Sequence, residues 1–126
     1  MCGAVAYEAQ AMRDEIDACH CASCRRWSGH FWASINAQYS SLGFLKGEEK
    51  IKWFVSSDVV RRGFCSECGS TLFWHSDRHK DYSNLLGISA GSLDAPTGGE
   101  LTLHIFVGEK GDYYALADGL PQKAGH

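Results

Sequence analysis

Cys19-His20-Cys21-Ala22-Ser23-Cys24 places three thiols within six consecutive positions. A second group, Cys65-Ser66-Glu67-Cys68, adds a C-x-x-C pair, and Cys2 stands alone near the start of the chain. A C-x-x-C turn is typical of a metal site, because its two sulfurs converge on one point while backbone N–H groups satisfy them. Gly69 follows this pair and suits a turn that needs a positive φ angle. The cysteines therefore indicate metal binding, and zinc best suits thiolates that have no evident redox partner.

Six cysteines are also compatible with disulfides, a redox pair or a cluster. Disulfides would demand a secreted protein, and the start Met1-Cys2-Gly3-Ala4-Val5 lacks the basic and apolar segments of a secretory signal. A thioredoxin-like pair would open a helix after a strand, and Gly69 beside Cys68 argues against that. An iron–sulfur cluster stays open as an alternative to zinc on spacing alone.

The composition predicts one domain with a packed core. The chain has 126 residues, and we expect a single zinc-binding domain over residues 1–126. Lys plus Arg number 12 and Asp plus Glu 15, so the formal charge is −3, which argues against a basic nucleic-acid-binding protein. No apolar run approaches the roughly 18 residues of a membrane helix. We expect a cytoplasmic protein without a nucleic-acid or membrane partner; the oligomeric state is not predicted.

Short segments with alternating apolar and polar residues, rich in β-branched and aromatic side chains, predict a mainly β fold. No segment keeps a 3.6-residue apolar period, so no long helix is expected, and residues 23–28 are expected to form a turn or a single helical turn. The 14 glycines suit tight turns between short strands. The loop 92–100 is expected to be the most flexible stretch. The predicted strands cover residues 4–9, 16–19, 30–35, 41–44, 51–55, 59–64, 71–75, 85–89 and 103–107.

Three motifs, in their order along the chain, resemble the glutathione-dependent formaldehyde-activating enzyme (GFA) family, also called the CENP-V/GFA domain. They are Cys2-Gly3-Ala4-Val5-Ala6-Tyr7, Cys19-His20-Cys21-Ala22-Ser23-Cys24-Arg25-Arg26 and Arg62-Gly63-Phe64-Cys65-Ser66-Glu67-Cys68-Gly69-Ser70. The segments 104–110 and 118–121 resemble the end of the family's domain. The resemblance covers nearly the whole chain and implies an Mss4-like fold of several short coiled antiparallel sheets, pinned by zinc-binding cysteine turns.

The resemblance also implies up to two zinc ions per chain. The structural zinc would be held by Cys2, Cys65 and Cys68. The family motif at the start is C-x-C-G, and Met1-Cys2-Gly3 matches only its second half. Either a further cysteine lies upstream of Met1, or water, the terminal amine or a neighbouring group takes its place. Our hypothesis is that this site is weakened or lost.

The second implied zinc would be held by Cys19, Cys21 and Cys24, keep an open position and form the catalytic site. The implied activity is that of a carbon–sulfur lyase resembling S-(hydroxymethyl)glutathione synthase, which joins glutathione, a small thiol, to formaldehyde. A thiol that enters the open position loses its proton at neutral pH because the cation stabilises the thiolate. Three thiolates give the centre a net charge of about −1, which lowers the Lewis acidity of zinc relative to three neutral histidines.

Several further residues are weaker candidates. Arg25 and Arg26 could bind glutathione carboxylates, since guanidinium groups match them, and solvated surface arginines are an equal alternative. His20 is expected to point away from the metal. His30 and His75 could donate to ligands or act as general bases, although a structural role is commoner. Strand alternation should send one of Arg61 and Arg62 outward. The four tryptophans are expected in the core rather than against a substrate: Trp27, Trp32, Trp53 and Trp74.

Two other functions stay open. One is a zinc-stabilised Mss4-like binding module without catalysis, since a fold does not fix a function. The other is a related zinc enzyme that acts on another thiol or small electrophile. An open coordination position at Cys19, Cys21 and Cys24 would favour an enzyme, and a fourth protein ligand there would favour a structural site.

Overall fold

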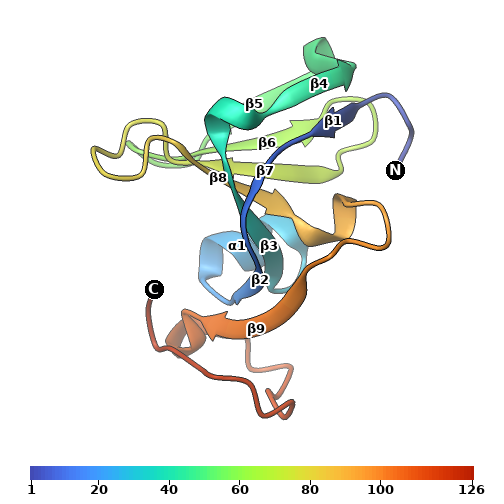
Figure 1. The fold of residues 1–126 in the computed structure, drawn as a ribbon. Helices are drawn as coiled ribbons and strands as arrows, with labels where there is room; N and C mark the ends of the chain where they lie inside the picture. Colours follow the sequence, from blue (N-terminus) through green and yellow to red (C-terminus); the bar gives the residue numbers. More distant parts are fainter.

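The computed structural model describes residues 1–126, and its fold is mainly β, as Figure 1 shows. The one α-helix is α1 (Ala22–Ser28), and four short 3-10 turns are η1 (Tyr39–Ser41), η2 (Glu48–Lys50), η3 (Ala90–Ser92) and η4 (Val107–Glu109). None of these helices has the length and apolar character needed to cross a membrane. The strands are β1 (Ala6–Glu8), β2 (Ala11–Cys19), β3 (Trp32–Gln38), β4 (Gly43–Lys46), β5 (Ile51–Val55), β6 (Arg61–Cys65), β7 (Thr71–His75), β8 (Leu85–Ser89) and β9 (Glu100–Ile105).

Seven strands form one sheet in the order β5-β6-β7-β8-β3-β2-β9, and β1 pairs with β4 in a second sheet. Every pairing is antiparallel except that of β2 with β9, which is parallel. The mainly β, Mss4-like fold class is therefore confirmed, with one parallel pair that the sequence did not predict. The chain leaves β8 and passes to the free edge of β2, so β9 runs in the same direction as β2.

The predicted elements occur with shifted bounds. The expected single helical turn is α1, and no longer helix is present. The strand expected over 16–19 begins earlier, at Ala11, and the strand expected over 30–35 begins at Trp32 and continues to Gln38. The expected flexibility of the loop 92–100 stays a prediction.

The core lies on one face of the seven-stranded sheet. Ile16 on β2 pairs with Ile35 on β3, Ile35 with Ile88 on β8, and Ile88 with Phe73 on β7, so four apolar side chains form a row across the strands. All four are at most 7% exposed. Neighbouring residues of a strand point to opposite faces of a sheet. The residues directly before and after each of these four in its own strand therefore lie on the other face.

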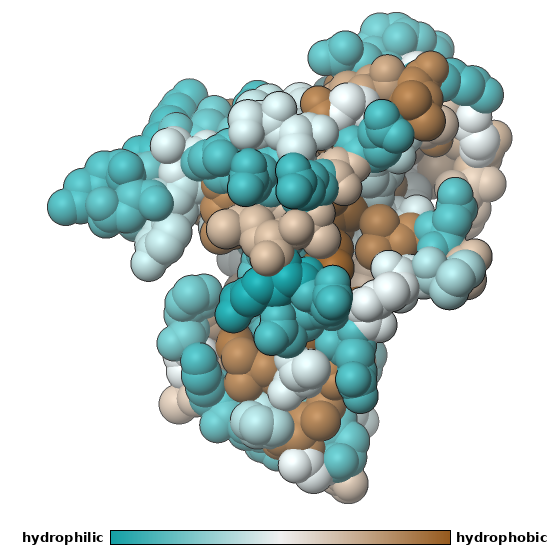
Figure 2. All heavy atoms as spheres, viewed as in Figure 1, coloured by the Kyte–Doolittle hydropathy of each residue, from teal (hydrophilic) through white to brown (hydrophobic).

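The small sheet covers the core face. Tyr7 of β1 and Phe44 of β4 pack against the buried cluster, with ring centroids 4.8 and 6.1 Å from that of Phe73. Figure 2 shows hydrophobic residues gathered over β1 and β4 and, separately, around β9, with hydrophilic residues between them. The segment 4–9 is therefore held by apolar packing, and it positions Cys2, which lies just before it, near the large sheet.

Gly47, in the turn between β4 and β5, lies directly against the N-terminal segment. Its φ angle is 75°, a left-handed conformation that favours glycine. A Cβ atom at this position would collide with the backbone carbonyl oxygen of Ala4. The turn and the N-terminal segment can therefore approach this closely only with glycine at position 47.

We expect Gly47→Ala to lower the free energy of unfolding by about 2–4 kcal/mol, since it adds a backbone clash to the left-handed strain. Gly98→Ala is the matched control, because Gly98 has a φ of 72° but nothing within 4 Å of a Cβ atom. It should lose only the strain, about 1 kcal/mol. Chemical denaturation of both variants measures the difference, and equal losses would contradict the proposed contact.

Candidate metal centre

The fold brings the six cysteines together in two groups of three. Within each group, the three Sγ atoms all lie within 4.8 Å of one another. All six are free thiols. We call these the first cysteine group and the second cysteine group. The first consists of Cys19, Cys21 and Cys24, and the second of Cys2, Cys65 and Cys68.

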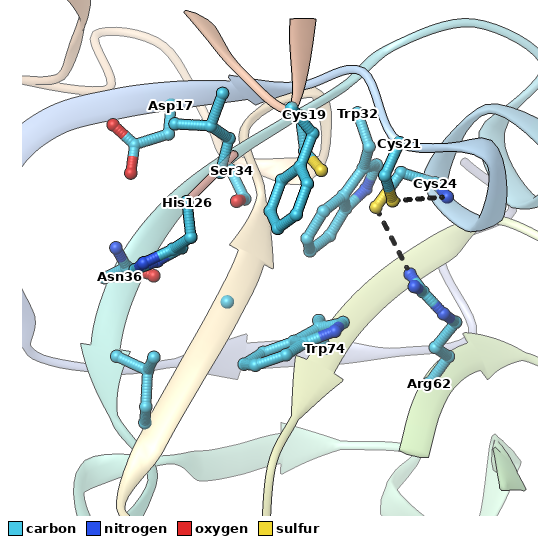
Figure 3. Close-up of a pocket in the computed structure, with 14 residues that line it drawn as sticks. Asp17, Cys19, Cys21, Cys24, Trp32, Ser34, Asn36, Arg62, Trp74 and His126 are labelled. Atoms are coloured by element: carbon cyan, nitrogen blue, oxygen red, sulfur yellow. Dashed lines mark hydrogen bonds between the residues drawn. The ribbon is translucent and has the colours of Figure 1, made fainter. Parts of the chain in front are cut away.

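The first cysteine group forms where β2 ends and α1 begins. Cys19 is the last residue of β2 and pairs with Trp32 of β3 on one side and Ile105 of β9 on the other. Cys21 is the N-cap of α1, and its Sγ atom accepts a hydrogen bond from the backbone N–H of Cys24 at 3.4 Å. One helical turn thus folds Cys24 back toward the strand, and the three sulfurs meet (Figure 3).

The second cysteine group joins the turn between β6 and β7 to the N-terminal segment. The backbone N–H of Gly69 donates to the carbonyl of Cys65 at 2.8 Å. Gly69 has a φ of 75°, which confirms the positive φ predicted at this position. The Sγ atoms of Cys2 and Cys65 are 3.8 Å apart. Two thiolates on one tetrahedral zinc, with Zn–S bonds of ~2.3 Å, would be separated by about the same distance.

The first cysteine group favours a cation on electrostatic grounds. The pKa of Cys21 is lowered, first by its hydrogen bond with Cys19 and then by that with Cys24, whereas the pKa of Cys19 is raised, first by its hydrogen bond with Cys21. One thiolate is thus stabilised at the expense of its neighbours. Ionising all three would place like charges within 4.8 Å, which requires a bound cation.

The donor atoms of both groups fit zinc. Each offers only soft sulfur ligands, without a carboxylate or imidazole among them. Each group has three thiols, one fewer than the four thiolates that hold a typical iron–sulfur cluster. Each group could therefore hold a metal ion.

A cavity of about 210 Å³ opens beside the first cysteine group, on the face of the large sheet opposite the core. Strand alternation selects the residues that face it: Asp17 and Cys19 on β2, Trp32, Ser34 and Asn36 on β3, and Trp74 on β7 (Figure 3). The rest of the lining is formed by Cys21, Cys24, Arg62, Leu85, Gly87, Ile105, Phe106 and His126.

The cavity walls are aromatic. Trp32 and Trp74 line the cavity, although the sequence analysis expected them in the core. Trp32 is also a buried core residue, since it is only 5% exposed. Gly87 makes room between them, because a Cβ atom there would lie 3.3 Å from the Trp32 ring. Phe106 has left-handed backbone angles, φ 56° and ψ 38°. Such strain in a non-glycine residue is often found at functional sites.

Arg62 is a site residue that the sequence analysis missed. It is 6% exposed, lines the cavity and donates from Nη1 to the Sγ atom of Cys24 at 3.6 Å. Its guanidinium lies 4.9 Å from the ring centroid of Trp27 and forms no ion pair with a carboxylate. A buried cation beside three sulfurs can offset the net charge of about −1 that three thiolates give a zinc centre.

Arg61 and Arg62 point to opposite faces of β6, as strand alternation predicts. The expectation that one of them is exposed to solvent is wrong, because both are at least partly buried. Arg61 binds Asp77 at 3.2 Å, and its side chain is 27% exposed. The other two candidate arginines, Arg25 and Arg26, do not line the cavity. The Nε atom of Arg25 donates to the carbonyl of His20 at 3.1 Å, and Arg26 is exposed.

His20 points away from the cysteines, as expected, and belongs to a chain of hydrogen bonds behind them. Asp118 accepts from His104 Nε2 at 2.8 Å, so His104 Nδ1 accepts from His20 Nε2 at 2.8 Å. His20 Nδ1 then accepts from the Tyr114 hydroxyl at 2.6 Å. Burial lowers the pKa of His20 to about 4, which keeps its imidazole neutral at pH 7. The chain fixes the backbone between Cys19 and Cys21.

The other two histidines named in the sequence analysis lie outside the cavity lining. His75 is 1% exposed, donates to the carbonyl of Ser83 at 2.9 Å and stacks on Tyr39, with ring centroids 3.7 Å apart. Burial lowers the pKa of His75. His30 is exposed, and its Nδ1 lies 3.4 Å from the Tyr113 hydroxyl. The contacts of His75 are those of a structural residue.

Comparisons with known proteins identify the family of this chain. Residues 1–109 match the family model described as glutathione-dependent formaldehyde-activating enzyme. The chain is 32% identical over 75 residues to an uncharacterized lyase of Schizosaccharomyces pombe, which covers 59% of this chain and 53% of that protein. The chain therefore spans about half the length of this curated relative.

A crystal structure of a Rhodobacter sphaeroides protein has a similar fold. It gives a TM-score of 0.61 at 22% sequence identity, and the match covers 79% of this chain and 92% of that chain. At this identity the likeness supports the fold alone.

We expect Arg62→Met to weaken the binding of one zinc equivalent by about tenfold at pH 7. Zinc binding requires all three thiols of the first cysteine group to be ionised, and the positive charge of Arg62 beside Cys24 stabilises the ionised form. Competition with a chromophoric chelator measures the affinity. Arg26→Met is the control, since Arg26 is exposed and outside the cavity. Equal zinc affinity in wild type and Arg62→Met would contradict this role.

Proposed function

The chain belongs to the glutathione-dependent formaldehyde-activating enzyme family, and from this we propose that it is a carbon–sulfur lyase. The proposed reaction joins a thiol, glutathione in the family's name, to formaldehyde and also runs in reverse. The observation that carries the proposal is the position of the first cysteine group at one end of an aromatic cavity. The second cysteine group also borders a cavity, of about 490 Å³, but Tyr7 is the one aromatic residue in its lining and no arginine lines it. Aromatic walls and a buried arginine therefore distinguish the first cysteine group.

The reaction needs an activated sulfur and a confined aldehyde. Zinc held by the first cysteine group would offer a fourth position and lower the pKa of a thiol there. The sulfur adds to the aldehyde carbon, so a C–S bond forms, the C=O π bond breaks and the oxygen takes a proton. Nothing is oxidised or reduced. Holding the two reactants together can contribute several kcal/mol to the rate.

The residues of the cavity have separate tasks in this proposal. Arg62 offsets the negative charge of the three sulfurs. It would thereby restore part of the Lewis acidity that three thiolate ligands remove from a zinc ion. The rings of Trp32, Trp74 and Phe106 exclude water from the reacting atoms. A volume of about 210 Å³ encloses only the reacting end of a tripeptide, since pockets for drug-sized ligands measure roughly 300–1,000 Å³.

The second cysteine group has a different task. It connects Cys2 and Cys65, which are 63 positions apart in the chain. Such a long-range connection stabilises a fold, and this use requires no catalytic role. A zinc ion there would fix the N-terminal segment to the β6–β7 turn and stabilise the fold. We therefore propose a structural zinc at this group, held by three thiolates and so less tightly than by four, in addition to the catalytic zinc at the first.

The rate of exchange between formaldehyde and a thiol tests the proposal. Exchange spectroscopy by NMR, with ¹³C-formaldehyde and either glutathione or 2-mercaptoethanol, should show a faster exchange with the protein than without it. Removal of zinc with a chelator should abolish the acceleration, and added zinc should restore it. If the exchange of neither thiol exceeds the spontaneous rate, the lyase proposal is wrong.

The first cysteine group should be required for that acceleration. We expect Cys21→Ser to abolish it, because a hydroxyl is a poor replacement for a thiolate ligand to zinc. Ser23→Ala is the matched control, since Ser23 is exposed in the same turn and should leave the rate unchanged. Circular dichroism establishes that both variants are folded. Full activity in folded Cys21→Ser would move the chemistry to another part of the molecule.

A further inference from the structure

The end of the cavity away from the cysteines is polar and contains an unpaired carboxylate. Asp17 of β2 pairs in register with Ser34 of β3, and Asn36 lies two residues further along β3 on the same face. All three line the cavity (Figure 3). Asp17 takes part in none of the chain's ion pairs, and no residue of the chain satisfies the three side chains with a hydrogen bond. Their hydrogen-bonding capacity is therefore available to a ligand.

The charges of the cavity are separated. Arg62 is the one guanidinium in the lining, and it faces the sulfur of Cys24 at the opposite end from Asp17 (Figure 3). No lysine lines the cavity, and His126 is the remaining titratable side chain near Asn36. A ligand carboxylate at this end would meet the like charge of Asp17, whereas a ligand ammonium would find both a carboxylate and the amide oxygen of Asn36.

The distance between the two ends limits the length of the ligand. Asp17 and Cys19 are two residues apart on the same face of β2, so their Cα atoms are separated by about 6–7 Å. A ligand with its sulfur at the first cysteine group and a cationic group at Asp17 must therefore carry the two on a short carbon chain.

We propose that the cavity selects short aminothiols, with the ammonium group bound by Asp17 and Asn36 and the sulfur at the first cysteine group. The inference depends on the proposed function and names the substrate class of that same site. Glutathione carries its ammonium group much further from the sulfur and has two carboxylates. On this basis glutathione binds through its sulfur alone and is not the preferred thiol.

Calorimetric binding of matched thiols to the zinc-loaded protein tests the inference. Cysteamine, 2-mercaptoethanol and mercaptoacetate have similar lengths and differ in carrying an ammonium, a hydroxyl or a carboxylate. We expect cysteamine to bind about tenfold more tightly than 2-mercaptoethanol, the effect of one partly buried ion pair. Mercaptoacetate should bind more weakly than either, because Asp17 repels it.

Variants of β2 and β3 separate the role of Asp17 from other causes. Asp17→Asn should reduce the preference for cysteamine over 2-mercaptoethanol to within about twofold. Asp14→Asn is the matched control, since it removes the same charge from an exposed position of the same strand, and it should leave the preference unchanged. Asn36→Asp should increase the preference, which gives a second test if Asp17→Asn does not fold.

The outcomes are distinct. Equal binding of the three thiols would overturn this inference and leave the lyase proposal intact. A cysteamine preference that persists in Asp17→Asn would come from the amine binding the metal and would also overturn it. If no thiol binds to the zinc-loaded protein, both the inference and the proposed function are wrong.

Discussion

The convergence of thiol groups at two points of the structure is the constraint on which the other features depend. Three Sγ atoms within 4.8 Å cannot all be ionised without a cation, so each group could hold a metal ion as three thiolates. The second cysteine group holds the N-terminal segment to the turn between β6 and β7, where apolar packing of the small sheet already brings it close. The first closes one end of a cavity. The two groups thus differ in their surroundings: one lies beside the N-terminal segment and the other at the end of a cavity with aromatic walls.

The cavity and the core arise from a single pattern. On β3, Ile35 and Ala37 face the core, while Trp32, Ser34 and Asn36 face the cavity. The cross-strand register continues the cavity face through Gly87 and Trp74 to Arg62, so a cation reaches the sulfur of Cys24. The sheet therefore supports the aromatic walls and the polar end of the cavity, and Cys21 and Cys24 at the start of α1, with Phe106 and His126, complete its lining.

Local features were predictable from the sequence, and long-range pairings were not. The first cysteine group, the positive φ of Gly69, the short α1 and most strands follow from spacing and periodicity within a few residues. The grouping of Cys2 with Cys65 and Cys68 was implied only by the family resemblance. The parallel pairing of β2 with β9 depends on which side of the sheet the chain returns to, and periodicity carries no such information. Arg62 and Asp17 were missed for the same reason: alternation places each on a face, but only the register brings Arg62 to Cys24 and Asp17 to the cavity.

The central claim is that the first cysteine group holds zinc with one position open to a thiol. X-ray absorption at the zinc edge tests it most directly, because it counts the sulfur neighbours of zinc at ~2.3 Å. We expect added 2-mercaptoethanol to raise the mean number of sulfur neighbours per zinc and to remove an oxygen or nitrogen neighbour. An unchanged spectrum with saturating thiol would mean that every zinc site is closed, and would favour a zinc-stabilised binding module over an enzyme.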